Sequence, residues 1–438
     1  MIGRYCVTLV AAIALATSKS ESAPTQSTAG RNEGERHTVV VDPAGRGDST
    51  TIQGGIDLVP PGGRVKVLPG TYPEALVIGK GLTLEGVARR RGAVLVAPSG
   101  TPTAAVQVTT SEQVTLRNLT VHSPGANGIG GQGTLDLTIE RVNVLAINPS
   151  VPGNLIVVVN NGGSGRATLV VVDSHVDGAI TGPVSSPQVF GIRVGGDIDA
   201  WLVGNEIRRT GGACIVVSPR ADLKGRTNAD IVNNDLDECY PTGRVASIIV
   251  GPGFPLPSPL PPITAEGTVN IIGNKIANTK IPELCHLPSA ISRPTSAISY
   301  EYFGGRIERN QILGVVQSCA APTVRNLPAA IWLGTLYSFP ADKSVVLQPV
   351  VVRHNDIVGN AQAGLRVAAT QTSPVDATCN WWGSATGPSG AGPGSGDAVI
   401  VEGTAPTPRF TPFATRPVAR TDGQFEGEDA GECAGESD

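Results

Sequence analysis

The amino-acid sequence predicts an all-β fold, a right-handed, single-stranded parallel β-helix solenoid. In its 438 residues, the order Asn, polar or charged residue, then Ile or Leu recurs five times. Each phrase sits after an apolar run and is followed by a second apolar run. Such repeats indicate units that pack only on their neighbours, and runs of about four β-branched residues indicate short strands. The phrases begin at Asn205, Asn234, Asn274, Asn310 and Asn355.

The apolar residue two positions after the Asn sets the register and extends the repeat towards the N-terminus. A coil of three short strands needs somewhat more than twenty residues at ~3.3 Å rise each, so the longer repeats carry loops. Earlier strands are expected at residues 64–68, 75–78, 82–84 and 93–96. The aligned residues are Val121, Val144, Val176, Ile207, Leu236, Ile276, Ile312 and Ile357.

The repeated Asn marks a corner of the coil. Its side chain tolerates the left-handed backbone conformation and can bond a neighbouring backbone group. Stacked from coil to coil, the five Asn side chains are expected to form an internal ladder at one corner.

Both ends of the solenoid need protection from strand addition. Residues 51–59 place Ile52, Ile56 and Val59 on one face of a helix, and Thr50 or Thr51 can cap it. The sequence therefore predicts a short N-terminal capping helix. At the other end, Trp381 and Trp382 are expected to form an aromatic C-terminal cap together with residues 410–413.

The chain is expected to divide into five segments. Arg4 and the apolar stretch after it are typical of a secretory signal peptide, with cleavage between residues 16 and 23. The protein is therefore expected to be secreted or to lie in the cell envelope. The segments are 1–23 signal peptide, 24–37 polar linker, 38–383 parallel β-helix, 384–417 C-terminal cap segment and 418–438 acidic disordered tail.

Composition excludes several classes of function. The formal net charge is −4 and no basic block is present, so neither nucleic acid nor an anionic membrane is an expected partner. No segment after the signal peptide is apolar enough to span a membrane. Aromatic residues are 4% of the chain, so the core is expected to be stacked Val, Ile and Leu.

Six cysteines remain once Cys6 leaves with the signal peptide, an even number that suggests disulfides. Four of them fall in the same corner of four successive coils, and coils ~4.8 Å apart suit disulfide geometry. No cysteine pair has the spacing of a zinc site, and neither a metal nor a cofactor is expected. The predicted pairs are Cys214–Cys239, Cys285–Cys319 and, by elimination, Cys379–Cys433.

Several segments resemble the opening of the pectin-lyase-like β-helix superfamily. They are residues 39–48, 51–53, 65–74 and 82–86, and the Gly-x-Tyr-x-Glu at 70–74 is shared with pectin methylesterases. Residues 380–384, 387–388 and 396–397 are similar to the closing segment of bacterial secreted β-helix repeat proteins. The resemblance covers residues 38 to about 413 and implies the fold, but one fold hosts many functions.

The enzymes of that superfamily carry motifs that this sequence lacks. It contains no Gln-Asp and no Asp-Phe, which hold the paired catalytic aspartates of the esterases. The characteristic motifs of pectate lyases, polygalacturonases and alginate epimerases are also absent. The chain therefore departs from its apparent relatives at the residues that would perform catalysis.

Strand alternation places ionisable residues on one outer face of three consecutive coils. One column contains His175, Glu206 and Asp235, and the other contains Asp177, Arg208 and Asp237. In one interpretation Glu206 and Asp235 are an acid/base pair, His175 carries a proton and Arg208 neutralises a uronate. In the other, the columns are a surface salt-bridge ladder with Arg208 between Asp177 and Asp237.

The strand after the next corner offers a second candidate face. Trp332 is predicted to point outward as a sugar-stacking platform, with Arg366 one coil away as its polar neighbour. Insertions at 277–297 and 313–330 either wall a groove beside Trp332 or cover it. The outward residues of this strand in successive coils are Arg193, Val216, Ile249, Ser299, Trp332 and Arg366.

Three functions are compatible with these observations. The first is a non-catalytic β-helix protein that binds extended polysaccharide or a cell-surface glycan or other surface partner. The second is a polysaccharide-processing enzyme, a lyase or hydrolase of a uronate-containing glycan. The third is a purely structural envelope protein. The missing catalytic motifs favour the first.

Overall fold

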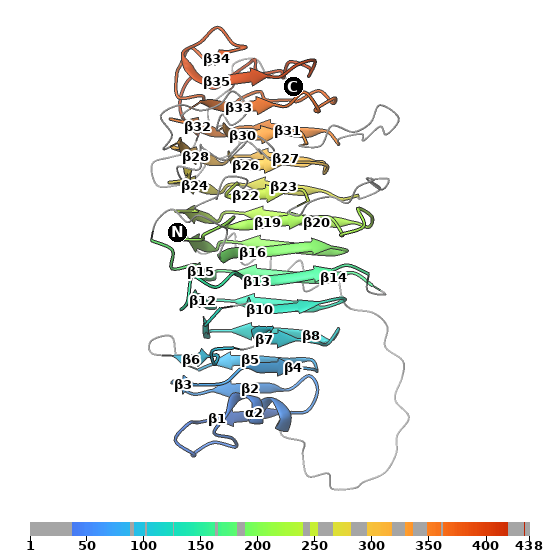
Figure 1. Ribbon diagram of the computed structural model, residues 1–438, viewed down its shortest axis with the longest axis vertical. Coiled ribbons are helices and arrows are strands. Elements are labelled where there is room, and N and C mark those ends of the chain that lie inside the picture. Colours follow the sequence, from blue (N-terminus) through green and yellow to red (C-terminus); the bar gives the residue numbers. More distant parts are fainter. Residues whose placement is uncertain are drawn as a thin grey trace. The chain divides into compact units, whose positions relative to one another are not determined.

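Three long parallel sheets form the protein, and the chain visits them in turn (Figure 1). In the computed structural model each strand pairs with the equivalent strand of the coils before and after it. This is the predicted parallel β-helix. The described residues are 37–87, 92–100, 103–125, 127–162, 165–181, 189–239, 246–252, 266–281, 296–317, 329–335, 348–360, 362–418 and 433.

Sheet A is the first sheet that each coil enters. It contains, in spatial order, β1 (Thr38–Val41), β2 (Arg64–Val67), β5 (Leu82–Gly86), β8 (Gln113–Arg117), β11 (Asp136–Glu140), β14 (Ala167–Val172), β17 (Ile198–Val203), β20 (Thr227–Val232), β23 (Val269–Ile272), β27 (Gly305–Glu308) and β31 (Val350–Arg353).

Sheet B follows one corner later. It contains β3 (Gly70–Tyr72), β6 (Ala93–Val96), β9 (Thr120–Ser123), β12 (Asn143–Ala146), β15 (His175–Asp177), β18 (Glu206–Arg208), β21 (Asp235–Asp237), β24 (Lys275–Ala277), β28 (Gln311–Leu313) and β32 (Asp356–Val358).

Sheet C completes the coil. It contains β4 (Leu76–Ile78), β7 (Ala104–Val108), β10 (Asn127–Gln132), β13 (Gly153–Asn160), β16 (Val189–Gly196), β19 (Ile215–Ser218), β22 (Ile248–Val250), β26 (Ser296–Tyr300), β30 (Ala329–Leu333), β33 (Ala363–Val367), β35 (Gly396–Val401) and β34 (Pro388–Gly390). A separate pair, β25 (Lys280–Ile281) and β29 (Val316–Gln317), lies beyond sheet B in the chain.

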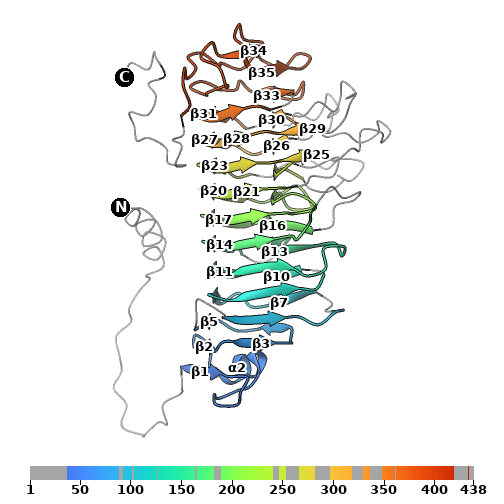
Figure 2. The same ribbon diagram turned by 90° about the vertical axis from the view of Figure 1, so that its left-hand side faces the viewer.

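The predicted register is confirmed from the third strand of sheet B to its last. Each aligned apolar residue faces its counterpart in the next coil, beginning with Val121 and Val144 and ending with Ile312 and Ile357. All of these side chains are buried. The inner columns of the three sheets therefore stack Val, Ile and Leu into one continuous core. Figure 2 shows the strands of successive coils lying one upon another.

The Asn ladder is also confirmed, at the corner between sheets A and B. Asn274 shows the repeating pattern: its Oδ1 accepts from the amide N and from Nδ2 of Asn234, each at 2.9 Å. Its Nδ2 donates to Asn310 Oδ1 at 3.0 Å and to the Ile231 carbonyl at 2.8 Å. The ladder runs one coil further than predicted at each end, to Ser174 and Asn380.

The expected reason for the Asn was wrong in one respect. The left-handed conformation falls on the residue before the Asn, as at Asn233 (φ 54°), Arg309 (φ 56°) and His354 (φ 54°). Selection for Asn at the corner therefore comes from its side-chain hydrogen bonds and not from its backbone tolerance.

Helix α2 (Ile52–Leu58) covers the first coils and buries Ile52 and Ile56. Thr51 caps it by accepting from the Gly54 amide at 3.1 Å. Glu74, from the Gly-x-Tyr-x-Glu motif, accepts from the amides of Ile52 and Gln53 at 2.7 and 3.0 Å. A carboxylate at this position compensates the unpaired amides of the first helical turn. The motif therefore has a structural role in this chain.

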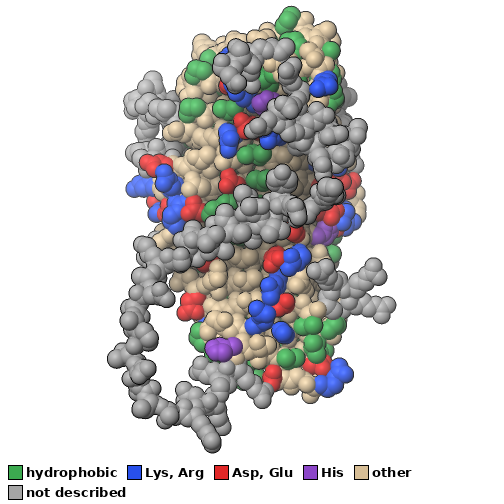
Figure 3. All heavy atoms as spheres, turned by 180° about the vertical axis from the view of Figure 1, so that it is seen from behind, with side chains coloured by type: hydrophobic (Ala, Val, Ile, Leu, Met, Phe, Trp, Pro, Cys, Tyr) green, Lys and Arg blue, Asp and Glu red, His purple; other side chains and the backbone are tan. Residues whose placement is uncertain are grey.

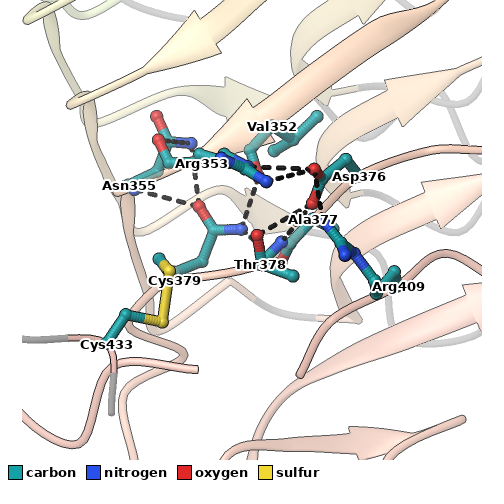
Figure 4. Close-up of a disulfide and its surroundings, with 10 residues drawn as sticks. Val352, Arg353, Asn355, Asp376, Ala377, Thr378, Cys379, Arg409 and Cys433 are labelled. Atoms are coloured by element: carbon teal, nitrogen blue, oxygen red, sulfur yellow. Dashed lines mark hydrogen bonds and ion pairs between the residues drawn. A yellow bond between two sulfur atoms is a disulfide. The ribbon is translucent and has the colours of Figure 1, made fainter. Parts of the chain in front are cut away.

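Of the two tryptophans predicted to cap the C-terminal end, Trp382 is fully buried and Trp381 is half-buried, and Phe410 and Phe413 pack against the same core as Trp382. The segment after Trp382 extends sheet C, since β35 pairs with β33. Cys379 forms a disulfide with Cys433 beside an ion-paired group in which Asp376 binds Arg353 and Arg409 (Figure 4).

Cys214 and Cys239 form the other described disulfide, with Cα atoms 5.7 Å apart. This pair and Cys379–Cys433 are the predicted ones. Cys285 and Cys319 lie outside the described residues, as do the expected signal peptide and nearly all of the acidic tail. Over the described ranges, no helix has the length and apolar character of a membrane span.

Candidate functional site

The ionisable face lies on the outer side of sheet B, from β15 to β24. We define it by His175, Asp177, Glu206, Arg208, Arg209, Asp235 and Lys275. Strand pairing places His175 beside Glu206, and Glu206 beside Asp235. In the second column Arg208 lies between Asp177 and Asp237. The predicted columns are therefore correct residue by residue.

Asp177 is the most buried member of the ionisable face, with 3% of its side chain exposed. It pairs with Arg209, whose Nε donates to Oδ1 at 2.9 Å, and it accepts from the Ala179 amide at 2.8 Å. Burial alone would raise the pKa of Asp177, but the nearby His175 ring and the hydrogen bonds from Arg209 and that amide outweigh it. The pKa is held well below its usual range, so this carboxylate stays ionised at neutral pH.

His175, Glu206 and Arg208 bind one another in a closed group. His175 Nδ1 lies 3.1 Å from Glu206 Oε2, and its Nε2 lies 3.2 Å from Arg208 Nη2. Arg208 Nη1 lies 2.9 Å from Glu206 Oε1. A neutral imidazole donates through one ring nitrogen and accepts through the other, so one tautomer satisfies both contacts. The three side chains thus bind one another through these atoms, while Arg208 Nε lies 3.8 Å from Asp177 Oδ2 and has no hydrogen-bond partner within the described residues.

Asp235 is also paired. Lys275 Nζ, one coil further on, lies 3.5 Å from its Oδ2, and half of the Asp235 side chain is exposed. Asp237 accepts from Asn278 Nδ2 at 2.7 Å. Glu206 and Asp235 are thus neighbours in register, as predicted, but each has its own cation. These ion pairs agree with the interpretation of the face as a surface salt-bridge ladder.

Arg209 was not singled out from the sequence although it binds Asp177 most directly. It follows the last residue of β18 and has a left-handed backbone (φ 52°). Side chains alternate between the two faces only within a strand. The sequence pattern therefore did not predict which way the Arg209 side chain points. The succession Arg208-Arg209 beside an acidic column was the only signal.

The outer face of sheet C is buried in its later described coils. Trp332 points outward by register between Ser299 and Arg366, yet it is only 2% exposed. Arg366 is 6% exposed, and its Nε pairs with Glu402 Oε1. The Trp332 ring is therefore not open to a sugar in this conformation, which favours the alternative that it is covered. Its role in binding stays a prediction.

Two hydroxyls on this buried face stand out. Ser296 and Ser299 lie on β26, beside Ala329 and Trp332 of the next coil. Within the described part of the chain neither Oγ has a hydrogen-bond partner. A nucleophilic serine needs a base within hydrogen-bond reach, so the described contacts give these residues no such role. The described residues likewise contain no group of three or more His, Cys, Asp or Glu side chains arranged for a metal ion.

On the face shown in Figure 3, charged side chains form small groups in which Lys or Arg lies near Asp or Glu. Blue and red side chains alternate on the face shown, with no broad field of one sign.

No protein-family model matches the chain, and no curated protein matches it significantly. Several solved structures are similar in fold. The mannuronan C-5 epimerase A-module of Azotobacter vinelandii is 15% identical, with a TM-score of 0.42, and the match covers 80% of this chain and 91% of that one.

A pectin methylesterase from Aspergillus niger is 13% identical, with a TM-score of 0.34 and coverage of 74% and 96%. The Dettilon tailspike protein is 12% identical, with a TM-score of 0.38 and coverage of 77% and 61%. At these values the similarities carry no argument about activity, and the parallel β-helix is established by the strand pairing of this chain itself.

Proposed function

We propose that this protein is a non-catalytic β-helix that binds an extended polysaccharide. The observation that carries the proposal is the ionic pairing of the candidate acid/base residues. Glu206 is bound by Arg208 and His175, and Asp235 by Lys275. Each carboxylate thus has its own cation at ion-pair distance, which is the arrangement of a surface salt bridge and not that of two carboxylates that share a proton.

The repeated architecture supports binding to a polymer. Outward columns present one side chain per coil at intervals of ~4.8 Å. A linear polysaccharide also repeats along its length, so it can use equivalent contacts on several coils. The sequence left two alternatives, a lyase or hydrolase of a uronate-containing glycan and a structural envelope protein. An experiment can distinguish both from this proposal.

The test is a binding screen of the purified protein against soluble polysaccharides, with product analysis of every mixture. The expected result is binding to at least one polymer without new reducing ends or unsaturated products. Any product that disappears in a Glu206→Gln, Asp235→Asn double variant would establish the enzyme instead. If the protein binds none of the polymers, the result favours a purely structural envelope protein.

We also propose that the protein acts outside the cytoplasm. The Cys214–Cys239 and Cys379–Cys433 disulfides support this, because such bonds persist in oxidising compartments. N-terminal sequencing of the mature protein tests the proposed signal peptide, with a start between residues 17 and 24 expected from the sequence. A cytoplasmic protein with its first residues intact would overturn the proposal.

A further inference from the structure

Trp201 lies on the outer face of sheet A, a face that neither candidate site uses. On β17 the residues Ile198, Ala200 and Leu202 are buried in the core, and the alternate residues, including Trp201, are half-buried. Strand pairing places Val170 on one side of Trp201 and Asp230 on the other. Trp201 is thus the aromatic member of an outward, half-buried column of sheet A.

One side of Trp201 is lined with polar groups. Arg166 donates to both carboxylate oxygens of Asp199, through Nε at 2.7 Å and Nη2 at 2.6 Å. Asn228 Nδ2 donates to Asp199 Oδ1 at 2.7 Å. The Arg166 hydrogen bonds hold the pKa of Asp199 below its usual range. This carboxylate is therefore ionised and held in position on the same face of β17, two residues before Trp201.

The column that contains Trp201 continues into a second acidic position. Asp230 accepts from Asn270 Nδ2 at 2.8 Å, and both side chains are half-buried. Within the described residues no cation lies at ion-pair distance from Asp230. Its second oxygen, Oδ2, is an acceptor without a described partner, which suits a hydroxyl donor from a ligand.

The other side of Trp201 is apolar. Four β-branched side chains form the next outward column in four consecutive coils, all half-buried. They are Val172, Val203, Val232 and Ile272. The outer face of sheet A therefore presents the Trp201 ring between an aliphatic column on one side and Asp and Asn side chains on the other.

The charges favour an uncharged ligand. Arg166 is committed to Asp199, and Arg226 also acts on that carboxylate. Arg306, in the coil after Asn270, pairs with Glu308. Asp230 adds a negative charge without a described counter-ion, so a uronate would meet repulsion instead of a free guanidinium.

We infer that the outer face of sheet A binds a neutral, linear polysaccharide, with Trp201 stacking on the apolar face of one sugar ring. Asp230 and Asn270 bind hydroxyls of the same or the adjacent sugar. Sugars present an apolar ring face and polar edges, and this surface offers matching groups on both sides of one tryptophan. The inference rests on the proposed function and names the site and ligand class for it.

The test measures affinity for neutral glucans, xylans and mannans and for two uronate polymers, pectate and alginate. Trp201→Ala is expected to weaken binding of the preferred neutral polymer about five- to tenfold, because stacking on an aromatic ring is lost. Trp201→Phe should stay within about twofold of the parent, since a ring remains. Trp381→Ala, a half-buried tryptophan of the last coil, is the matched control and should leave affinity unchanged.

A second variant, Asp230→Ala, removes a hydroxyl acceptor without touching the ring and should also reduce affinity severalfold. Melting temperatures of the Trp201 and Asp230 variants should remain within about 2 °C of the parent, because both side chains are only half-buried. If the parent binds a neutral polymer and Trp201→Ala binds equally well, the site is wrong and the proposed function stands. Preference for uronates would overturn the ligand class, and no binding at all would end both proposals.

Discussion

Two polar ladders run side by side through the same coils, one inside the protein and one outside it. Adjacent residues belong to different ladders: Asn205 and Glu206, Asn234 and Asp235, Asn274 and Lys275. The inner positions are at most 1% exposed and keep the same residue from Asn205 to Asn380. The outer positions are about half exposed at Glu206 and Asp235 and change from acid to Lys.

Water explains the difference. A buried amide that loses its partner costs about 1–3 kcal/mol, so each inner position must supply the same donors and acceptors to both neighbours. An exposed carboxylate that loses its partner is solvated instead, and an exposed ion pair contributes only about 0–1 kcal/mol. The inner positions therefore keep the same residue, and the outer positions can vary, because only the outer ones are solvated by water.

Asn274→Ala is expected to lower the free energy of unfolding by about 3–5 kcal/mol. The change removes the acceptor of two Asn234 donors and the donors to Asn310 and the Ile231 carbonyl. Denaturant unfolding of the parent and the variant measures it. Lys275→Ala, at the next residue, is the matched control and should cost less than about 1 kcal/mol. If both variants lose the same free energy of unfolding, the inner and outer ladders do not differ in the way proposed.

Asp177→Asn tests a buried carboxylate in the neighbouring outward column of sheet B. The substitution removes the charge that Arg209 binds while keeping the size of the side chain. A loss of about 1–3 kcal/mol is expected, intermediate between the two ladders, because a hydrogen bond to a charged group contributes more than a neutral one. The melting curve of Asp235→Asn provides the exposed comparison. If Asp177→Asn costs no more stability than Asp235→Asn, burial does not make the Asp177 ion pair more stabilising than the exposed Asp235 ion pair.

The same residue predicts a pH dependence. The folded pKa of Asp177 is lowered, so its contribution to stability is present above the unfolded value, about 3.9, and is lost as pH falls towards the folded pKa. The stability gap between the parent and Asp177→Asn should therefore be constant above about pH 5 and shrink below pH 4. Unfolding curves at several pH values measure the gap. A gap that grows on acidification would contradict the sign.

The fold and its register were predictable because each coil repeats the same alternation. Val176, Ile207 and Leu236 could be aligned from the Asn phrase alone, and strand pairing agrees at every one of them. The disulfide between Cys214 and Cys239 followed from the same register, because one corner of neighbouring coils brings the two residues within bonding distance.

The state of the outer faces was not predictable in the same way. Alternation gives the direction in which a side chain points but not whether other residues cover it. Trp332 was therefore correctly predicted to point outward, while its burial was only one of two alternatives. Trp201 shows the opposite case. It lies within an apolar run, Ala200-Trp201-Leu202, which resembles core sequence and hides its outward direction.

Glu206→Gln and Asp235→Asn are expected to have the smallest effects. Each carboxylate is about half exposed and its cation is solvated when the partner is lost, so each change should cost less than about 1 kcal/mol. Both losses should shrink further at high salt, because exposed charges are screened within about 10 Å at 0.1 M ionic strength. Thermal unfolding at low and high salt measures this. Polysaccharide affinity should be unchanged in both variants, since the proposed binding face is on sheet A; an abolished turnover with unchanged melting would instead restore the acid/base pair.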